Sequence, residues 1–549
     1  MSLNFLILFS FYFIILLTIL GYGYFVLSFE KNDKFFLNFG HVGLLGIFFL
    51  ITYSYLSHIF IPHSKIHNLI LILIGLISFF YHFKKNFRIP NLRKNLFFLF
   101  LVFLILFISL ILKKNHDDFP YYHFSYTYNL TQESLNFGIG KLNHGFRTPS
   151  SIFYLNSLFF LPFAEYYLFN FSAVFILGFT NIILLQRILL FNANFQNDKR
   201  KITFINYLSL LSFIFINIFF YRIAEHGTDR SAQILIFLLS INLLDYFQSR
   251  NYQKVDLLFT YALLGLIVSL KSFYFLYFIF SIPFILFFLE KKRNLLSTLK
   301  FIILNKYFSY LFILIFLVIL SYFANTGCLL YPISFTCLEN FTWSIPPNDV
   351  SKMNDWYELW SKAGANPNFR VQNPEQYISG FNWVSNWMND YFFNKISDLI
   401  FGILFILLIL FIIFYNFEKK KNKIQISNLV FLMYGLLILI LFEWFYNHPA
   451  LRYGGYCLIA LIFFIPFSLY LNSKEISFKK YFKIALILVI FSLSIFEIRN
   501  YSRIVKEIKI YDYKPFKETF YTIDHNYFKI QKRIDDLKNK DGVFSKTIF

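Results

Sequence analysis

Long runs of apolar residues, separated by short polar segments, recur along most of the chain. A helix needs about 20 mainly apolar residues to cross the hydrocarbon core of a bilayer, which is about 30 Å thick. Runs near this length cover residues 3–29, 36–61, 67–83, 96–112, 166–191, 202–221, 232–247, 255–270, 272–289, 305–324, 397–416, 426–446, 454–472 and 482–497. The pattern therefore predicts an all-α polytopic membrane protein with about 14 transmembrane helices.

The composition points to the same class of protein. Of the 549 residues, 57% are hydrophobic and only 15% are charged, whereas a soluble domain is about 45–50% apolar and about 25% charged. Such a chain cannot cover a water-facing surface with polar groups. A soluble enzyme, a disordered protein, collagen and a secreted disulfide scaffold are therefore excluded.

The distribution of Lys and Arg predicts the orientation of the chain. The formal net charge is +21, which in a soluble protein would suggest a nucleic-acid partner. Here the basic residues concentrate in alternate loops, which the positive-inside rule assigns to the cytoplasm. They include Lys84, Lys85, Arg88, Lys199, Arg200, Lys201, Lys291, Lys292, Arg293, Lys419, Lys420 and Lys421. We therefore expect no nucleic-acid partner, and an outer location for the N-terminus and for loops 113–150 and 325–396.

The remaining segments complete the predicted organisation. A transmembrane domain covers residues 1–497, and a polar tail, 498–549, follows on the outer side. Segment 151–163 is apolar but too short to span a bilayer. We predict that it forms an interfacial helix that lies on the outer leaflet.

The three cysteines and the known nucleotide and metal motifs restrict the chemistry. Cys328 and Cys337 lie nine residues apart in the outer loop, and they could form a disulfide or remain two free thiols. Cys457 lies inside a span. Walker A, HExxH and CxxC patterns do not occur, which argues against ATP hydrolysis and a thiolate zinc site. We predict no cofactor, although carboxylates with histidines could hold a divalent metal ion.

The first outer loop carries the most promising polar group. His116, Asp117, Asp118 and His123 follow a membrane span directly, and ionisable groups near membrane depth are functional candidates. The alternative is a solvated helix end whose acids are neutralised by the two lysines that precede them. We expect Asp117 or Asp118 to be catalytic.

Further cations and histidines are predicted to lie at the same membrane boundary. An arginine matches phosphate geometry, but each of these residues could also serve as an interfacial anchor, and Lys271 could snorkel to the surface. The convergence of several cations beside a carboxylate pair predicts a substrate-binding site. The candidates are His116, His123, His144, Arg147, His226, Asp229, Arg230, Lys271, His448 and Arg452.

Several short stretches give the chain a family resemblance. An acidic pair after a span, followed by a juxtamembrane helix, resembles the GT-C fold of integral-membrane glycosyltransferases, and Gly265–Ser272 resembles the GLxxxTK-like segment of that superfamily. More narrowly, the chain is similar to an uncharacterised bacterial family of polytopic membrane proteins. The similar stretches are 117–123, 137–144, 329–332 followed by Trp343, and 449–453.

The resemblance implies a function. It implies an inverting glycosyltransferase that moves a sugar from a polyprenyl-phosphate donor to an envelope glycan, lipid or protein acceptor, with Asp117 as the favoured base. It also implies a bacterial inner (cytoplasmic) membrane location, a site that faces the periplasm, and membrane lipids as neighbours. An envelope-polysaccharide polymerase or ligase is an alternative, as is a lipid-carrier flippase or transporter. Carriers place their sites near the midplane, whereas these ionisable residues lie at span boundaries.

Overall fold

The computed structural model describes residues 2–30, 38–86, 92–189, 202–250, 254–292, 294–366, 371–418 and 425–524, together with Tyr527, Lys532 and Asp536. Within these residues the regular structure is helical, and β pairing is confined to isolated bridges, such as those of Leu161 with Glu165 and of Cys328 with Cys337. Eight of the basic residues used above for orientation lie outside the described residues: Arg88, Lys199, Arg200, Lys201, Arg293, Lys419, Lys420 and Lys421.

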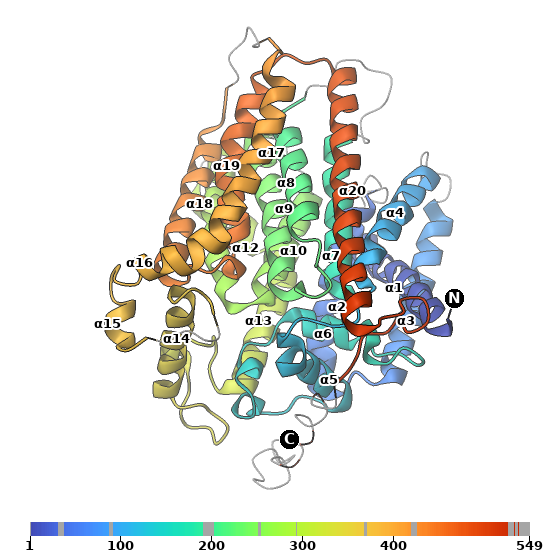
Figure 1. The fold of residues 1–549 in the computed structure, drawn as a ribbon, viewed down its shortest axis with the longest axis vertical. Helices are drawn as coiled ribbons and strands as arrows, with labels where there is room; N and C mark the ends of the chain where they lie inside the picture. The colour runs from blue at the N-terminus through green and yellow to red at the C-terminus, as the bar shows by residue number, and fades with distance from the viewer. Residues whose placement is uncertain are drawn as a thin grey trace.

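Long helices form the body of the molecule (Figure 1). They are α1 (Leu3–Ser28), α2 (Phe39–Phe60), α3 (Lys65–Asn86), α4 (Leu92–Leu106), α7 (Phe171–Leu189), α8 (Phe204–Phe219), α9 (Gly227–Ser249), α10 (Lys254–Leu270), α11 (Ser281–Lys292), α13 (Lys306–Thr326), α17 (Ser397–Tyr415), α18 (Asn428–Asn447), α19 (Gly455–Asn472) and α20 (Phe478–Tyr511). Each predicted span overlaps one of these helices. The prediction of an all-α polytopic membrane fold is confirmed.

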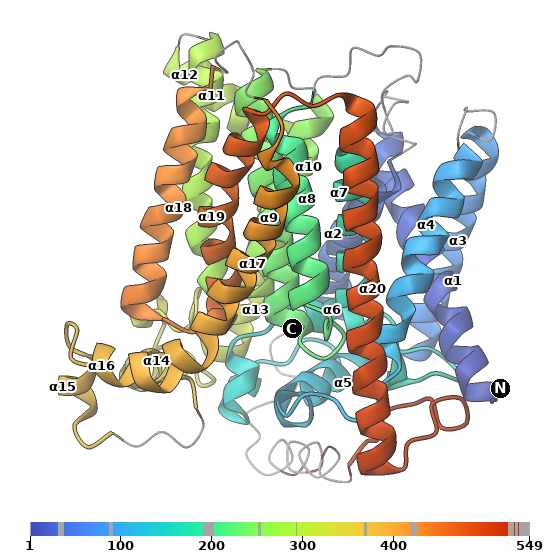
Figure 2. The ribbon, with the colours of Figure 1, turned by 45° about the horizontal axis from the view of Figure 1, so that its top comes forward.

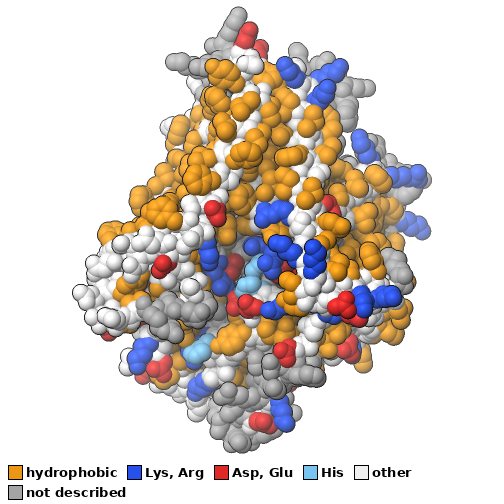
Figure 3. Space-filling model, in the orientation of Figure 1, with side chains coloured by type: hydrophobic (Ala, Val, Ile, Leu, Met, Phe, Trp, Pro, Cys, Tyr) orange, Lys and Arg blue, Asp and Glu red, His pale blue; other side chains and the backbone are white. Residues whose placement is uncertain are grey.

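Twelve helical segments of the described chain are long and apolar enough to cross a membrane. The two other predicted spans, 202–221 and 255–270, correspond to shorter apolar helices, Phe204–Phe219 and Asp256–Leu270. Nearly all residues of α7, α8 and α9 are buried by protein, which explains how short helices are accommodated at the centre of the bundle. Apolar side chains cover the outer surface of the helices (Figure 3).

The boundary between two predicted spans at Lys271 is a real break in helical structure. Helix α10 ends at Leu270, Lys271 is extended with φ −161° and ψ 150°, and a 3₁₀ stretch over Ser272–Phe280 leads into α11. A basic residue with an extended backbone therefore separates two apolar helical segments. This break brings the Lys271 amine to the membrane boundary.

The segments predicted to be outer loops lie together at one end of the bundle (Figures 1 and 2). They carry the short helices α5 (Phe124–Gln132), α6 (Ser151–Ser157), α14 (Pro347–Lys362), α15 (Pro374–Ile378) and α16 (Val384–Trp387), while α12 (Leu295–Ile303) lies at the opposite end. Cys328 and Cys337 form a disulfide, and Cys457 is a buried free thiol. The loops thus form a continuous layer over one end of the helices.

Two predicted segments differ from the structure. Helix α6 has seven residues, all buried, and does not lie on a leaflet surface. Polar contacts hold it inside the protein: Ser157 bonds to the His63 ring at 2.7 Å, and Ser269 donates to Ser151 at 3.0 Å. The chain after residue 497 is not a separate tail, because α20 continues to Tyr511.

The residues after α20 return to the loop layer. The Thr522 amide donates to the carbonyl of Lys113 at 2.8 Å, and the Ser2 amide donates to the carbonyl of Phe516 at 2.9 Å. Phe520 stacks on Tyr167 with ring centroids 4.1 Å apart. The C-terminal segment therefore joins the first outer loop to the N-terminus of α1.

The arrangement predicts which engineered thiols share a side of the membrane. Lys141, Gln376 and Ser477 are exposed, and the native cysteines give no background because two are bridged and the third is buried. A membrane-impermeant maleimide applied to intact cells should label Lys141→Cys and Gln376→Cys but not Ser477→Cys, which should react only after permeabilisation. Opposite behaviour of Lys141→Cys and Gln376→Cys would contradict the single loop layer.

Candidate functional site

A network of charged side chains, of which Asp229 is buried and the others partly buried, lies where α9, the break at Lys271 and the turn after α18 meet. Lys271 Nζ donates to Asp229 Oδ1, and Arg452 Nε donates to Asp229 Oδ2 at 3.0 Å. Arg452 Nη2 also donates to Asp118 Oδ2 at 3.3 Å. Two carboxylates and two cations from four distant parts of the sequence therefore form one connected network.

Local structure fixes these side chains. Asp229 is in the first turn of α9, where a carboxylate is favoured by the helix dipole. Arg452 lies in a 3₁₀ turn, Leu451–Tyr453, whose carbonyls accept hydrogen bonds from the side chains of Gln233 and Tyr274 at 3.3 Å. Gly454, at φ 102°, ends that turn and permits α19 to start at once.

Aromatic rings enclose Arg452. Its guanidinium carbon lies 5.6 Å from the ring centre of Trp360 and 5.9 Å from that of Tyr453, and Lys271 Nζ lies 5.7 Å from the Tyr453 ring. Such cation–π contacts are favourable when desolvated. Because Trp360 belongs to α14, the large outer loop forms one wall of the site. Of the other loop tryptophans, Trp343, Trp383 and Trp387 are buried in protein.

Two histidines lie beside Asp118. His116 Nδ1 accepts a hydrogen bond from the Asp118 amide at 3.1 Å, and its ring contacts the ring of His226 with centroids 4.4 Å apart. Burial lowers the pKa of His116, and burial together with nearby Arg230 lowers the pKa of His226 well below its ordinary value. Both rings are therefore neutral at pH 7, so the positive charge of the site comes from Lys and Arg.

A second charged group, adjacent in the loop before α9, was not among the sequence-predicted site residues. Glu225, with a side chain only 1% exposed, accepts two hydrogen bonds from Arg222 and lies 4.0 Å from Arg503. Arg503 also pairs with Glu507 at 3.1 Å, and Glu507 accepts from the Lys113 amide at 2.7 Å. The i, i+4 spacing of Arg503 and Glu507 beyond the last apolar run was the available sequence signal.

Arg230 differs from the other cations of the site. It has no salt bridge within the described part of the chain, and its buried Nη1 atom has no hydrogen-bond partner there. Its guanidinium carbon lies 5.7 Å from the ring centre of Phe220. Figure 3 shows basic, acidic and histidine side chains gathered where the apolar surface meets the loops, between α17 and α20. An anion could approach from this face.

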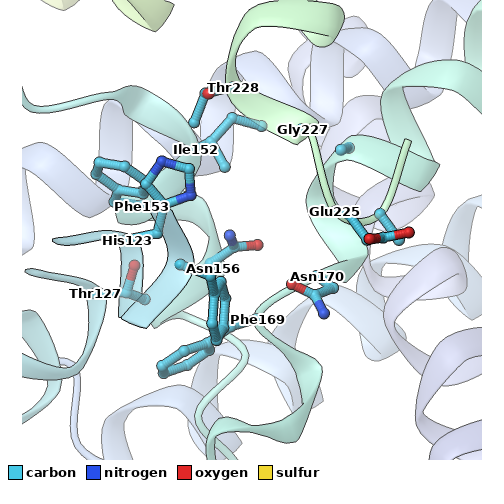
Figure 4. A pocket seen from close by; sticks show the side chains of 13 residues that line it. His123, Thr127, Ile152, Phe153, Asn156, Phe169, Asn170, Glu225, Gly227 and Thr228 are labelled. Carbon is cyan, nitrogen blue, oxygen red and sulfur yellow. The ribbon is translucent and has the colours of Figure 1, made fainter. Parts of the chain in front are cut away.

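A small cavity with both polar and apolar walls lies next to the charged residues (Figure 4). It has a volume of about 20 Å³ and is lined by His123, Asn156, Asn170, Glu225 and Thr228 among others, so it has room for one water molecule. His123 Nε2 is buried without a hydrogen-bond partner among the described residues, and burial lowers the pKa of His123 to about 3. His123 is thus a neutral polar group of this cavity.

The other sequence-predicted residues lie outside the network. The Asp117 side chain is 88% exposed and contacts Lys114 at 3.5 Å. Arg147 donates to the carbonyl of Gly140 at 2.9 Å and to the Tyr331 hydroxyl at 3.4 Å. His144 is exposed, and burial lowers the pKa of His448 to about 4, with Lys362 acting in the same direction. Among the described residues no three His, Cys, Asp or Glu side chains are grouped so as to hold a metal ion.

The fold and this network define a multi-pass membrane protein whose charged site lies at the boundary between its helices and its loop layer. The chain belongs to the family described as "Domain of unknown function (DUF8201)", whose model matches residues 5–459. No curated protein and no solved structure matches the chain. The matched range includes Asp118, Asp229, Lys271 and Arg452.

Removal of the shared carboxylate should destabilise the protein. Asp229→Asn leaves Lys271 without its anion in a site where both side chains are at most 15% exposed, and breaking a buried pair costs about 3–5 kcal/mol. We expect a clear loss of thermal stability in detergent. Asp117→Asn, at an exposed position, is the matched control and should stay within about 0.5 kcal/mol. Equal stability of the two variants would contradict the network.

The neutral state of His226 predicts a pH effect on stability. Because its pKa is lowered in the folded protein, the unfolded chain binds a proton first as pH falls below about 6.5, and stability is lost in that range. His226→Gln removes this contribution, so its Tm should fall less than that of the wild type between pH 7.5 and pH 5. At pH 8 the His226 side chain is neutral in both the folded and the unfolded wild type, so the difference in Tm between wild type and variant at that pH measures the change in packing alone and is subtracted. Parallel curves would refute the prediction.

Proposed function

We propose that this protein transfers a sugar from a polyprenyl-phosphate-linked donor to an acceptor hydroxyl at the outer face of the membrane. The observation that carries the proposal is one carboxylate from the first outer loop, Asp118, in contact with Arg452, which belongs to a charged network with Asp229 and Lys271. A bacterial inner membrane, with the loop layer facing the periplasm, is part of the proposal. The disulfide in that layer supports an oxidising side.

Each part of the site matches one requirement of this reaction. The attacking hydroxyl loses its proton to Asp118 as its oxygen bonds to the anomeric carbon, a step that a positioned base accelerates by about 10²–10⁴-fold. The bond from the anomeric carbon to the phosphate oxygen breaks, and its electron pair leaves with the lipid phosphate. Displacement from the opposite side inverts the anomeric centre.

The leaving phosphate needs positive charge more than a proton. Arg230 suits this role because it has no carboxylate partner among the described residues, while Arg452 and Lys271 already neutralise Asp229. The lipid chain of the donor could lie along the apolar helices that flank the site. On these helices Phe401, Phe405 and Phe491 are more than half exposed.

Asp118, and not Asp117, is the base in this proposal. The two residues are adjacent in sequence, but the Asp118 side chain is 29% exposed beside Arg452 and His116, whereas Asp117 projects away toward Lys114. For in-line displacement the base has to reach the acceptor hydroxyl on the side of the sugar opposite the leaving phosphate, and of the two carboxylates only Asp118 lies in the charged site. The GT-C resemblance points to the same reaction class but favoured Asp117; the contacts of Asp118 with Arg452 and His116 are the reason to propose Asp118 instead.

Paired substitutions test the assignment. In reconstituted vesicles supplied with a panel of polyprenyl-phosphate hexoses and a panel of glycan acceptors, release of free polyprenyl phosphate is followed by mass spectrometry. Asp118→Asn should lower turnover by about 10²–10⁴-fold, while Asp117→Asn should remain within a few-fold of the wild type. Arg230→Lys, which loses the planar guanidinium fork, should weaken the reaction, and Arg147→Lys, tied to a loop carbonyl, should not. Near-normal turnover in Asp118→Asn would contradict the assignment of Asp118 as the base.

A further inference from the structure

A second hollow lies at the loop-layer end of α3, away from the charged network. It has a volume of about 510 Å³, and its walls include Lys65, Tyr128, Gln132, Phe160, Glu165 and Tyr166. This volume lies within the range of about 300–1,000 Å³ that is usual for ligand sites. Helix α5 connects the two regions: His123 precedes it directly, and Gln132, which lines the groove, ends it nine residues later, about 13 Å along the helix axis at 1.5 Å per residue.

The wall of this groove is aromatic over a continuous stretch. The Tyr128 ring meets the edge of Phe160 at a centroid distance of 6.2 Å and the edge of Tyr166 at 6.3 Å. Gln132 and Thr131 lie on the same helix and bond to each other at 2.7 Å. Aromatic rings and neutral hydrogen-bonding groups therefore line the groove side by side, as an amphipathic ligand requires.

The charges in the groove cancel. Lys65 Nζ lies 2.7 Å from Glu165 Oε1, and it also lies 5.1 Å from the ring centre of Phe160. The single cation among the lining residues is thus neutralised by the single carboxylate. This balance favours a neutral ligand over an anionic headgroup, since an anion would have to compete with Glu165 for Lys65.

The backbone holds Glu165 in the groove at a conformational cost. Glu165 has φ 47° and ψ −129°, a combination that residues other than glycine rarely adopt. A tight turn enforces it, in which the Glu165 amide donates to the carbonyl of Leu161 at 2.7 Å. Strain of this kind is retained mainly at functional positions, and here its effect is to bring a carboxylate to Lys65.

We propose that this groove binds a neutral saccharide chain. The aromatic wall would pack against the apolar faces of the sugar rings, while Gln132, Lys65 and Glu165 would hydrogen-bond to hydroxyl groups. Ile66, at the edge of the groove, is 74% exposed on a helix that faces lipid, so a glycan held here lies close to the membrane surface. The identification of the bound saccharide with the acceptor glycan rests on the proposed transferase function. The proposal that the groove binds a saccharide does not rest on that function.

Direct binding tests the inference without any transfer reaction. The full-length protein in phosphatidylcholine nanodiscs is titrated with maltotriose and with chitotriose, and binding is followed by saturation-transfer NMR. We expect saturable binding of at least one trisaccharide. Tyr128→Ala should weaken it at least tenfold, whereas Tyr128→Phe, which keeps the ring, should retain most of it.

Glycine substitutions separate loss of binding from loss of folding. Glu165→Gly removes the carboxylate but suits the backbone conformation, so saccharide binding should fall at least tenfold while Tm stays the same or rises. Phe163→Gly is the matched control, because Phe163 also has a positive φ, 68°, on the same turn but does not line the groove. Its binding should stay within twofold of the wild type.

The outcomes that overturn the inference are distinct from those that overturn the transferase proposal. Absence of binding of both trisaccharides, or unchanged binding in Tyr128→Ala, removes the saccharide site whatever the Asp118 variants show. Preferential binding of dihexanoyl phosphatidylglycerol would instead assign the groove to an anionic lipid and also overturn the proposal. Loss of transfer in Asp118→Asn with intact saccharide binding would leave both proposals standing.

Discussion

The carboxylate of Asp229 is the interaction on which the site depends. It lies at the start of a helix that is buried along most of its length, and it neutralises both Lys271 and Arg452. Neither cation would be tolerated at the edge of an apolar bundle without an anion. Through Arg452 the same carboxylate is connected to Asp118 and thus to the first outer loop. The Asp229 carboxylate therefore links three segments: the break between α10 and α11, the turn after α18 and the loop layer.

The large outer loop completes the enclosure. Trp360 closes over Arg452, and α14 is in turn fixed by the buried amine of Lys362, which contacts Glu358, the carbonyl of Ile378 and the rings of Trp383 and Tyr446. A tryptophan-rich sequence outside a membrane usually suggests interfacial anchoring. Here most of its rings pack inside the loop layer and stabilise the wall of a charged site.

The sequence predicted the fold well because one force dominates it. An apolar run near membrane length forms a helix regardless of what it packs against. The spans and the break at Lys271 were therefore predictable from the local sequence pattern alone. The site was predictable only in part. Lys271, Asp229 and Arg452 were chosen because they stand at span boundaries, but which of Asp117 and Asp118 faces the cations depends on the π-helical turn at Phe119–His123. The buried state of α6 and the approach of Arg503 to Glu225 depend on partners far away in sequence, which no local pattern reveals.

The return of the C-terminal segment to the loop layer has a consequence for biosynthesis. The first outer loop leaves the ribosome long before the last helix, yet the Lys113 amide is bonded to Glu507 and the Lys113 carbonyl to Thr522. Arg503, also late in the chain, donates to the carbonyl of Ile111 at 2.8 Å. Helices are inserted in order from the N-terminus. The loop that carries Asp118 therefore acquires its contacts with the C-terminal residues only after the last helix has been inserted. Incompletely inserted chains would therefore carry the acidic pair without the contacts that hold it in place, and the charged site would assemble only when the whole protein is in the membrane.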